Sequence, residues 1–398
     1  MINFDRVSVN EFLSDYWQKK PCVLRNALPD FTLPLTPDEL AGLAMEDDIE
    51  SRMVFETPGS APFWHLKRGP FSEQDFETLP PTHWTLLVQG VDRFVPEVAQ
   101  WLRAFNFLPS WRVDDIMISF APKHGSVGPH YDNYDVFLYQ ALGKREWSLT
   151  SKHCEPGNAL QGVELRIMKE FHTEEVVVLE EGDMLYLPPH VGHHGVSLSD
   201  ECMTFSFGYR SYQNQEMWQS FSDYLADTEH PVTLYKDPDW SGLKSHAEIP
   251  KSACRNAREL LQNLLDDKHL FQSWFGSFAT QPDHQAEQCF PSPLEDDEYT
   301  TSADFLNEWQ ALQEPLERIP VCRMAYLWGE HGLQLFINGC EWDIAGVSEE
   351  LVQHIADNNT LFPAQIAAFL DERHPNAAKN RELLFELWKL QWIQYPEQ

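Results

Sequence analysis

Positive charge is scarce in this chain of 398 residues. It holds 29 Lys and Arg residues against 62 Asp and Glu residues, a formal net charge of −33. Proteins that bind phosphate backbones or anionic membranes do so with clustered Lys and Arg. The composition therefore argues against nucleic acid or a membrane as partner. A basic protein fits better, because an acidic surface speeds and orients its approach. An acidic surface kept only for solubility is the alternative.

Paired cysteines and long apolar runs are also missing. The seven cysteines stand singly, with no CxxC spacing, which excludes a zinc knuckle and a disulfide framework and favours reduced thiols. No apolar run of 18 uncharged residues occurs, and the N-terminal sequence MINFDRVSVNEF lacks the apolar core of a signal peptide. We expect a soluble, cytoplasmic protein.

Apolar residues are plentiful enough for a folded core. Hydrophobic residues make up 42% of the chain and aromatic residues 13%, which excludes a disordered chain, and the length predicts two or three domains. The first 110 residues are predicted to be mainly helices and short connections. Their clearest signal is a capping box over Thr36-Pro37-Asp38-Glu39, which predicts a helix beginning there.

Residues 114–210 have the composition of short strands separated by glycines. The predicted strands are 116–120, 135–142, 145–150, 174–180, 183–189 and 203–210. Several short strands within one hundred residues indicate an all-β barrel or jelly roll.

Helical periodicity returns after Ser211. Apolar stripes over 211–285 carry more apolar surface than a small helix pair needs, so we expect a homodimer or packing on the barrel. A Pro-rich acidic segment follows, with a linker at 286–300. The last part, 301–398, combines helices with a hairpin turn at Asn338-Gly339 and is predicted to be winged-helix-like. From Leu294 to the end it has 19 acidic and 6 basic residues, which favours protein contact over DNA.

Two clusters of metal-ligating residues lie about 60 residues apart. His130 and Asp132 are two positions apart, so in a strand they share one face; a surface or turn pair is the alternative. A second strand delivers His190, His193 and His194. Two imidazoles and one carboxylate on one face form the facial triad of Fe(II) oxygenases. Strand alternation favours His193, which shares its face with small or polar residues, with His194 and then His190 as alternatives.

Arg145 begins the strand that follows the turn at Gly143. An Arg directed into a barrel needs a counter-charge, and its planar fork matches a carboxylate. A dicarboxylate could therefore bind iron at one end and Arg145 at the other. The alternative is a surface Arg beside Lys144.

These motifs resemble a known family. GSVGPHYDNYDVFLYQALGKREW and EEGDMLYLPPHVGHHG are similar to the JmjC-type, cupin-fold Fe(II)/2-oxoglutarate oxygenases. DYWQKKPCVLRNA and DELAGLAMEDDIESR more closely resemble the bacterial ribosomal oxygenases that hydroxylate an arginine of a large-subunit ribosomal protein. The resemblance implies an α+β protein with a double-stranded β-helix (cupin/JmjC jelly roll) over 1–210, a helical dimerisation region over 211–285, the linker 286–300 and a winged-helix-like domain over 301–398.

The resemblance also assigns roles to residues. It implies that His130, Asp132 and His193 bind Fe(II) and that Arg145 binds the far carboxylate of the co-substrate 2-oxoglutarate. Thr204 stands where the family has an Asn that makes a secondary co-substrate contact.

The implied reaction is hydroxylation of the β-carbon of an arginine in a basic ribosomal protein. Turn and core roles are the favoured interpretation of Tyr134 and Asp135; the alternative is that either could meet the substrate guanidinium. Two rival functions are a cupin metalloenzyme without 2-oxoglutarate, which would need no Arg145, and a binding or assembly protein that uses the barrel as a scaffold.

Overall fold

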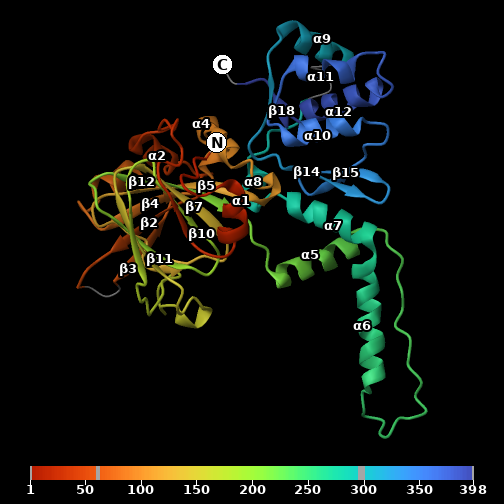
Figure 1. The fold of residues 1–398 in the computed structure, drawn as a ribbon, viewed down its shortest axis with the longest axis horizontal. Helices are drawn as coiled ribbons and strands as arrows, with labels where there is room; N and C mark the ends of the chain where they lie inside the picture. The colour runs from red at the N-terminus through yellow and green to blue at the C-terminus, as the bar shows by residue number, and fades with distance from the viewer. Residues whose placement is uncertain (1, 60–62, 295–300, 397–398) are drawn as a thin grey trace. The chain divides into compact units, whose positions relative to one another are not determined.

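The chain divides into two compact units, residues 1–211 and residues 212–398 (Figure 1). This computed structural model describes residues 2–59, 63–294 and 301–396. Among the described residues, none of the helices is both long and apolar enough to span a bilayer.

The first unit is built on two antiparallel sheets. The major sheet has the order β1-β10-β7-β12-β5-β4-β2-β3, and the minor sheet has the order β6-β11-β8-β9. The strands are β1 (Cys22–Leu24), β2 (Ser51–Glu56), β3 (Trp64–Arg68), β4 (Trp84–Val88), β5 (Val113–Ala121), β6 (His130–Tyr131), β7 (Asp135–Leu142), β8 (Arg145–Thr150), β9 (Glu175–Leu179), β10 (Met184–Leu187), β11 (Gly192–Ser197) and β12 (Cys202–Tyr209). The predicted double-stranded β-helix is confirmed.

Strand alternation in β7 shows which side of the major sheet faces the minor sheet. Val136 and Leu138 belong to one buried cluster with Trp147 and Leu149 of β8, so they lie between the sheets. Phe137 and its alternating neighbours belong to the large core on the other face, which N-terminal segments cover. We call the space between the sheets the barrel interior.

The N-terminal region contains more strand than the sequence predicts. Besides short helices it supplies β1 to β4, and β4 joins the centre of the major sheet beside β5. The expectation of mainly helices was wrong because WTLLV in β4 is buried at every position, and a short, uniformly apolar run has no strand alternation to detect. The capping box is confirmed, since α2 (Pro37–Leu43) begins there and Thr36 Oγ1 accepts a hydrogen bond from Glu39 N at 3.3 Å.

The helices of the first unit are short. They are α1 (Val9–Glu11), continued by a π-helical turn over Phe12–Tyr16, with α2, α3 (Glu73–Glu77) and α4 (Pro96–Ala99).

The second unit begins with three longer helices, α5 (Asn214–Asp227), α6 (Lys251–Asp266) and α7 (Lys268–Thr280). Phe221 of α5 packs with Trp274 and Phe278 of α7. In contrast, none of the residues of α6 is buried. Figure 1 shows α6 with the segment that precedes it running alongside, where Asn256 Nδ2 donates to the carbonyl of Lys236 at 2.9 Å.

The rest of the second unit has the predicted helices and hairpins. Its elements are α8 (His284–Gln288), α9 (Ser302–Leu312), β13 (Leu316–Arg318), β14 (Met324–Gly329), β15 (Gly332–Ile337), β16 (Cys340–Trp342), α10 (Glu349–Asp357), β17 (Thr360–Leu361), α11 (Pro363–Leu370), α12 (Ala377–Lys389) and β18 (Ile393–Gln394). The hairpin turn at Asn338-Gly339 joins β15 to β16 as the sequence predicts, and α10, α11 and α12 begin after Ser348, Phe362 and Asn376.

The segment expected as a linker is packed where the structure describes it. Ala286, in α8, is buried, and Leu294 N donates to the carbonyl of Lys389 at 2.8 Å. Residues 295–300 of that segment lie outside the described residues.

Candidate functional site

Two histidines face each other across neighbouring strands of the minor sheet. His130 of β6 pairs directly with His193 of β11, and their ring centroids lie 4.2 Å apart. Asp132 Oδ2 lies 3.6 Å from His193 Nε2. The three residues offer ligand atoms that all lie within 4.8 Å of one another. The fold therefore brings together the two-histidine, one-carboxylate set that the sequence singles out.

Backbone carbonyls fix the orientation of both imidazoles. His130 Nδ1 lies 2.9 Å from Gly128 O, and His193 Nδ1 lies 3.0 Å from Val191 O. Because a carbonyl only accepts, each Nδ1 carries a proton, and Nε2 is the atom through which each neutral ring would ligate a metal. Burial, with His130 nearby, lowers the pKa of His193 to about 4, so this imidazole stays neutral at physiological pH. Neutral, oriented imidazoles are ready to ligate a metal.

The other two candidate histidines lie apart from this set. His194 pairs with Ser148 and so points to the opposite face of β11 from His193, which pairs with Leu149. Its buried Nε2 has no hydrogen-bond partner among the described residues. His190 occupies a turn with φ of 63°, where its backbone N donates to the carbonyl of Asp132 at 2.8 Å.

Arg145 is a buried cation whose guanidinium is largely unpartnered. It is the first residue of β8, pairs with Ser197 of β11 and is only 3% exposed. Its Nε and Nη2 atoms have no hydrogen-bond partner in the part of the chain that the structure describes, and the guanidinium lies 5.7 Å from the Trp147 ring centroid. A buried, unpaired guanidinium is strongly unfavourable, so this position fits an anionic ligand. Lys144 instead pairs at the surface with Glu180 at 2.6 Å.

Polar side chains on the major sheet line the same interior. Thr204 of β12 pairs directly with Gln140, which alternates with the inward Leu138, and it also pairs with Ser119 of β5. Thr204 Oγ1 lies 3.3 Å from its acceptor, Gln140 Oε1. Ser119 and Gln140 are buried functional candidates that sequence reasoning missed. The sequence signal that could have identified them is a polar residue at an inward-facing position of an otherwise apolar strand.

Asp135 is not available to a substrate. It is fully buried on the opposite face of β7, where its carboxylate accepts from Tyr186 Oη at 2.6 Å and from Gln18 Nε2 at 3.1 Å. Arg112 lies 3.4 Å away as its counter-charge. The favoured core role of Asp135 is therefore confirmed, and the alternative, contact with a substrate guanidinium, is wrong.

Tyr134, two residues after Asp132, and a missed carboxyl group, Asp115, lie close enough to interact electrostatically. Tyr134 is 43% exposed, and the charge of Asp132 is the main cause that raises the pKa of its phenol well above its usual value. Asp115 is buried and accepts from Gly90 N at 2.8 Å and from Gln89 Nε2 at 2.7 Å. Burial and neighbouring carboxylates raise the pKa of Asp115 to about 7. A nearby cation would restore its charge.

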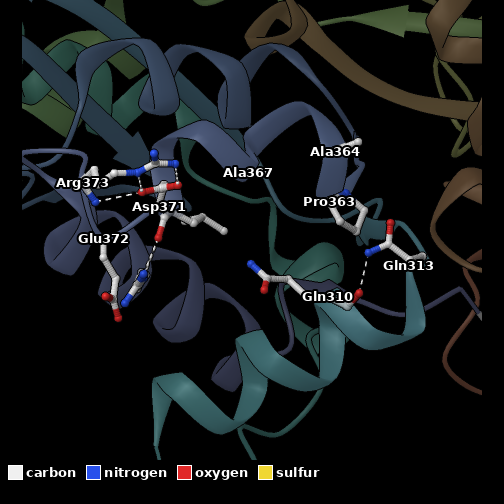
Figure 2. A pocket seen from close by; sticks show the side chains of 10 residues that line it. Gln310, Gln313, Pro363, Ala364, Ala367, Asp371, Glu372 and Arg373 are labelled. Carbon is white, nitrogen blue, oxygen red and sulfur yellow. Dashed lines mark hydrogen bonds and ion pairs between the residues drawn. The ribbon is translucent and has the colours of Figure 1, made fainter.

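A separate hollow lies in the winged-helix part, between α9, α11 and the start of α12 (Figure 2). Its two arginines are already engaged. Arg373 forms a two-point pair with Asp371, at 2.8 and 2.6 Å, and Arg381 Nε donates to the carbonyl of Leu370 at 2.8 Å. The arginines of this hollow therefore differ from Arg145 of the barrel interior, which keeps unpaired donors.

Comparison with known proteins agrees with this geometry. Residues 100–217 match the JmjC domain family, and residues 263–394 match the ROXA-like winged helix family. The ribosomal protein uL16 3-hydroxylase of Escherichia coli is 37% identical over 288 residues, which span 71% of this chain and 74% of that protein. A probable ribosomal oxygenase of Haemophilus influenzae is 32% identical over 379 residues, 90% of this chain and 88% of that protein.

Solved structures give the same result. The crystal structure of E. coli YcfD is 30% identical, with a TM-score of 0.82 over 98% of this chain and 99% of that one. A structure of the same E. coli ribosomal oxygenase in complex with cobalt and 2-oxoglutarate is 29% identical, with a TM-score of 0.79 and the same coverage. The chain thus belongs to the ribosomal oxygenases, enzymes that join a JmjC barrel to a ROXA-like winged helix.

Proposed function

We propose that this enzyme uses Fe(II) and 2-oxoglutarate to hydroxylate the β-carbon of an arginine in a large-subunit ribosomal protein, of the uL16 type. The observation that carries the proposal is the buried, unpaired Arg145 guanidinium in the same interior as the histidine–carboxylate set. A cupin enzyme without 2-oxoglutarate, or a scaffold protein, would gain nothing from this unfavourable charge.

Each residue has a role in this proposal. His130, Asp132 and His193 hold Fe(II) and occupy three coordination positions, which leaves three for the co-substrate and oxygen. Bound iron supplies the oxidising power, drawn from oxygen and 2-oxoglutarate, that a C–H bond of this kind requires. Arg145 pairs with the far carboxylate of 2-oxoglutarate and so fixes which end reaches the metal. The buried hydroxyl of Thr204 completes the polar wall.

The substrate side of the site suits a basic chain. The protein carries a net charge of −33, which favours encounter with a basic partner. Tyr134, partly exposed and two residues after Asp132, provides an aromatic face that a guanidinium can use through a cation–π contact.

The test measures hydroxylation in vitro of recombinant uL16 and of a uL16 variant in which the modified arginine is replaced by Lys. The enzyme, Fe(II), ascorbate and 2-oxoglutarate are incubated with the protein, and peptides are analysed by tandem mass spectrometry. We expect the mass of one oxygen atom on a single arginine, with stoichiometric succinate. Substituting that arginine by Lys should abolish the modification. Succinate release that never depends on the ribosomal protein would overturn the substrate assignment.

We also propose that the helices over 211–285 form a homodimer. The support is apolar surface that the second unit leaves exposed, including Trp218 at 51%, Leu261 at 47% and Ile249 at 79%. α6 has its apolar residues on one side and none of them buried. Isologous association of two such faces removes this surface from water.

A ribosomal protein substrate implies an enzyme that works in the cytoplasm. All seven cysteines are free, as a reducing compartment requires. The acidic winged-helix part suits contact with protein rather than nucleic acid.

A further inference from the structure

A second group of metal-ligating side chains lies outside the catalytic site, in the loop between β8 and β9. His153, Glu170 and His172 are all exposed, and their ligand atoms lie within 4.8 Å of one another. Two imidazoles and one carboxylate are the donor set of Zn²⁺ and related divalent metals. We propose that these three residues form a second divalent transition-metal site, of the Zn²⁺ type, that cross-links two stretches of this loop.

The backbone already holds the ligands close to one another. Asn158 Nδ2 donates to the carbonyl of His153 at 3.0 Å and to the carbonyl of Glu170 at 2.8 Å, while its Oδ1 accepts from Glu170 N at 2.9 Å. One side chain therefore ties together the two stretches that carry the ligands. Because the backbone is fixed in advance, metal binding has less chain entropy to overcome.

The base of the same loop is closed by Glu174. Its Oε2 accepts from the backbone N of Ser151 at 2.6 Å and from Ser151 Oγ at 2.7 Å, and its Oε1 lies 3.1 Å from Lys152 Nζ. Lys152, which directly precedes His153, thus has its own counter-charge. The repulsion that it would exert on a bound cation is reduced.

Three protein ligands at an exposed position leave the fourth tetrahedral position to water. Such a site is open to solvent rather than enclosed. We therefore expect a micromolar dissociation constant for Zn²⁺, weaker than that of an enclosed structural zinc site. The metal therefore stabilises a loop that is already folded, and the loop does not need the metal in order to fold.

This loop contacts the chain directly before each of the two catalytic histidines. Met168 N donates to the carbonyl of Pro129 at 2.7 Å, directly before His130. The side chains of Met168 and Cys154 lie close beside Gly192, directly before His193. Metal bound to the loop should therefore restrain a segment that borders the catalytic site, without touching the catalytic metal.

The experiment measures zinc in a protein whose catalytic site is disabled. In a His130→Ala/Asp132→Ala double variant, we expect isothermal titration with Zn²⁺ to give about one equivalent per chain. Adding His172→Ala or Glu170→Gln should weaken that binding by roughly tenfold or more. His246→Ala removes an exposed histidine elsewhere and should change nothing. Glu170→Gln is the gentler variant, because Asn158 bonds only to the backbone of Glu170.

Limited proteolysis gives a second readout. Arg166 and Lys169 are exposed trypsin sites in the loop. Zn²⁺ should slow cleavage there in the double variant and have no effect once His172→Ala is added. The proposal is overturned if the double variant binds no zinc at tens of micromolar, or if the His172→Ala and His246→Ala proteins bind it equally. Because two of the three catalytic ligands are removed throughout, these results do not depend on the proposed hydroxylase activity.

Discussion

At the scale of single residues, the site depends on polar groups that the barrel buries without protein partners. Arg145 keeps two donor nitrogens unpaired among the described residues, and backbone carbonyls accept from Nδ1 of His130 and of His193, so that Nε2 is the ring atom turned to a metal. Such groups destabilise the protein alone and are stabilised by ligands. Their effects can be separated by single substitutions.

The adjacent histidines of β11 give the first prediction. His193→Ala should abolish Fe(II)-dependent succinate formation and Co²⁺ binding, because His193 lies within ligand distance of His130 and Asp132. His194→Ala removes a buried nitrogen that has no partner among the described residues, so both properties should persist. The measurements are cobalt titration and turnover, with circular dichroism as a control for folding. Retained cobalt affinity in His193→Ala would contradict this ligand assignment.

The second prediction concerns the co-substrate. Arg145→Lys keeps a positive charge but loses the planar fork, and losing a two-point charged pair costs about 1.5–3 kcal/mol. The 2-oxoglutarate concentration for half-maximal succinate formation should rise roughly 10- to 150-fold. Metal affinity should stay unchanged. Lys144→Arg is the matched control, since Lys144 pairs at the surface with Glu180. An unchanged requirement in Arg145→Lys would place the carboxylate elsewhere.

The third prediction concerns pH and Asp115. Its pKa is raised to about 7 by burial and neighbouring carboxylates, against about 4 in an unfolded chain. The native state therefore keeps this proton where the unfolded state has lost it, so this group's contribution to the free energy of unfolding falls as pH rises from about 4 to about 7. Asp115→Asn should remove that contribution. The check is urea unfolding of both proteins across this range, and parallel pH profiles would refute the expectation.

At the scale of elements, pairing between β8 and β11 builds the wall that carries Arg145 and His193. Gly195 of β11 pairs with Trp147 of β8, and the indole lies across the glycine. A Cβ at Gly195 would lie 2.7 Å from the Trp147 ring. The glycine thus leaves room for Trp147, whose ring centroid lies 5.7 Å from the Arg145 guanidinium and 5.8 Å from the His193 ring centroid.

A fourth prediction follows for Gly195→Ala. The added methyl must displace a large buried ring, so we expect a loss of about 1–3 kcal/mol in the free energy of unfolding and weaker 2-oxoglutarate binding. Gly157→Ala is the control, because an added Cβ there meets nothing within 4 Å. Urea denaturation measures the first effect, and titration of the Co²⁺-loaded protein with 2-oxoglutarate measures the second. Equal stability of the two variants would show that the ring moves freely.

At the scale of the whole molecule, acidic charge and exposed apolar helix surface have separate roles in the proposed function and the proposed dimer. The charge suits a basic substrate, while the surface of α6 and its preceding segment suits a second copy of the chain. Val232 and Leu234 in that segment are 84% and 79% exposed. Leaving so much apolar surface in water is unfavourable unless association covers it.

The fifth prediction concerns this association. The wild-type protein should be a dimer by light scattering at micromolar concentration, and Leu261→Glu on α6 should shift it to monomer by burying an unpaired charge in the interface. Leu312→Glu, at an exposed apolar position at the end of α9, should leave the mass unchanged. A wild-type monomer, or a Leu261→Glu dimer, would reject the interface.

Much of this protein follows from local sequence. The strands of the barrel, the helix start at Thr36 and the turn at Asn338-Gly339 depend on alternation, capping and turn chemistry, which act over a few residues. Alternation along β11 also separates His193 from His194, because adjacent residues of a strand point to opposite faces. The family resemblance, in turn, follows from contiguous motifs.

Only the tertiary structure decides which distant groups meet. Asp135 and Tyr134 are neighbours in sequence, yet one lies in the core behind the major sheet and the other is partly exposed near Asp132. β1 escapes detection because its partner, β10, lies far along the chain, and β4 because its uniformly apolar run shows no alternation. Burial of the unpaired Arg145 nitrogens is likewise a property of the closed barrel. Sequence patterns encode the face on which a side chain lies, whereas its partners and its exposure to water depend on how remote segments pack.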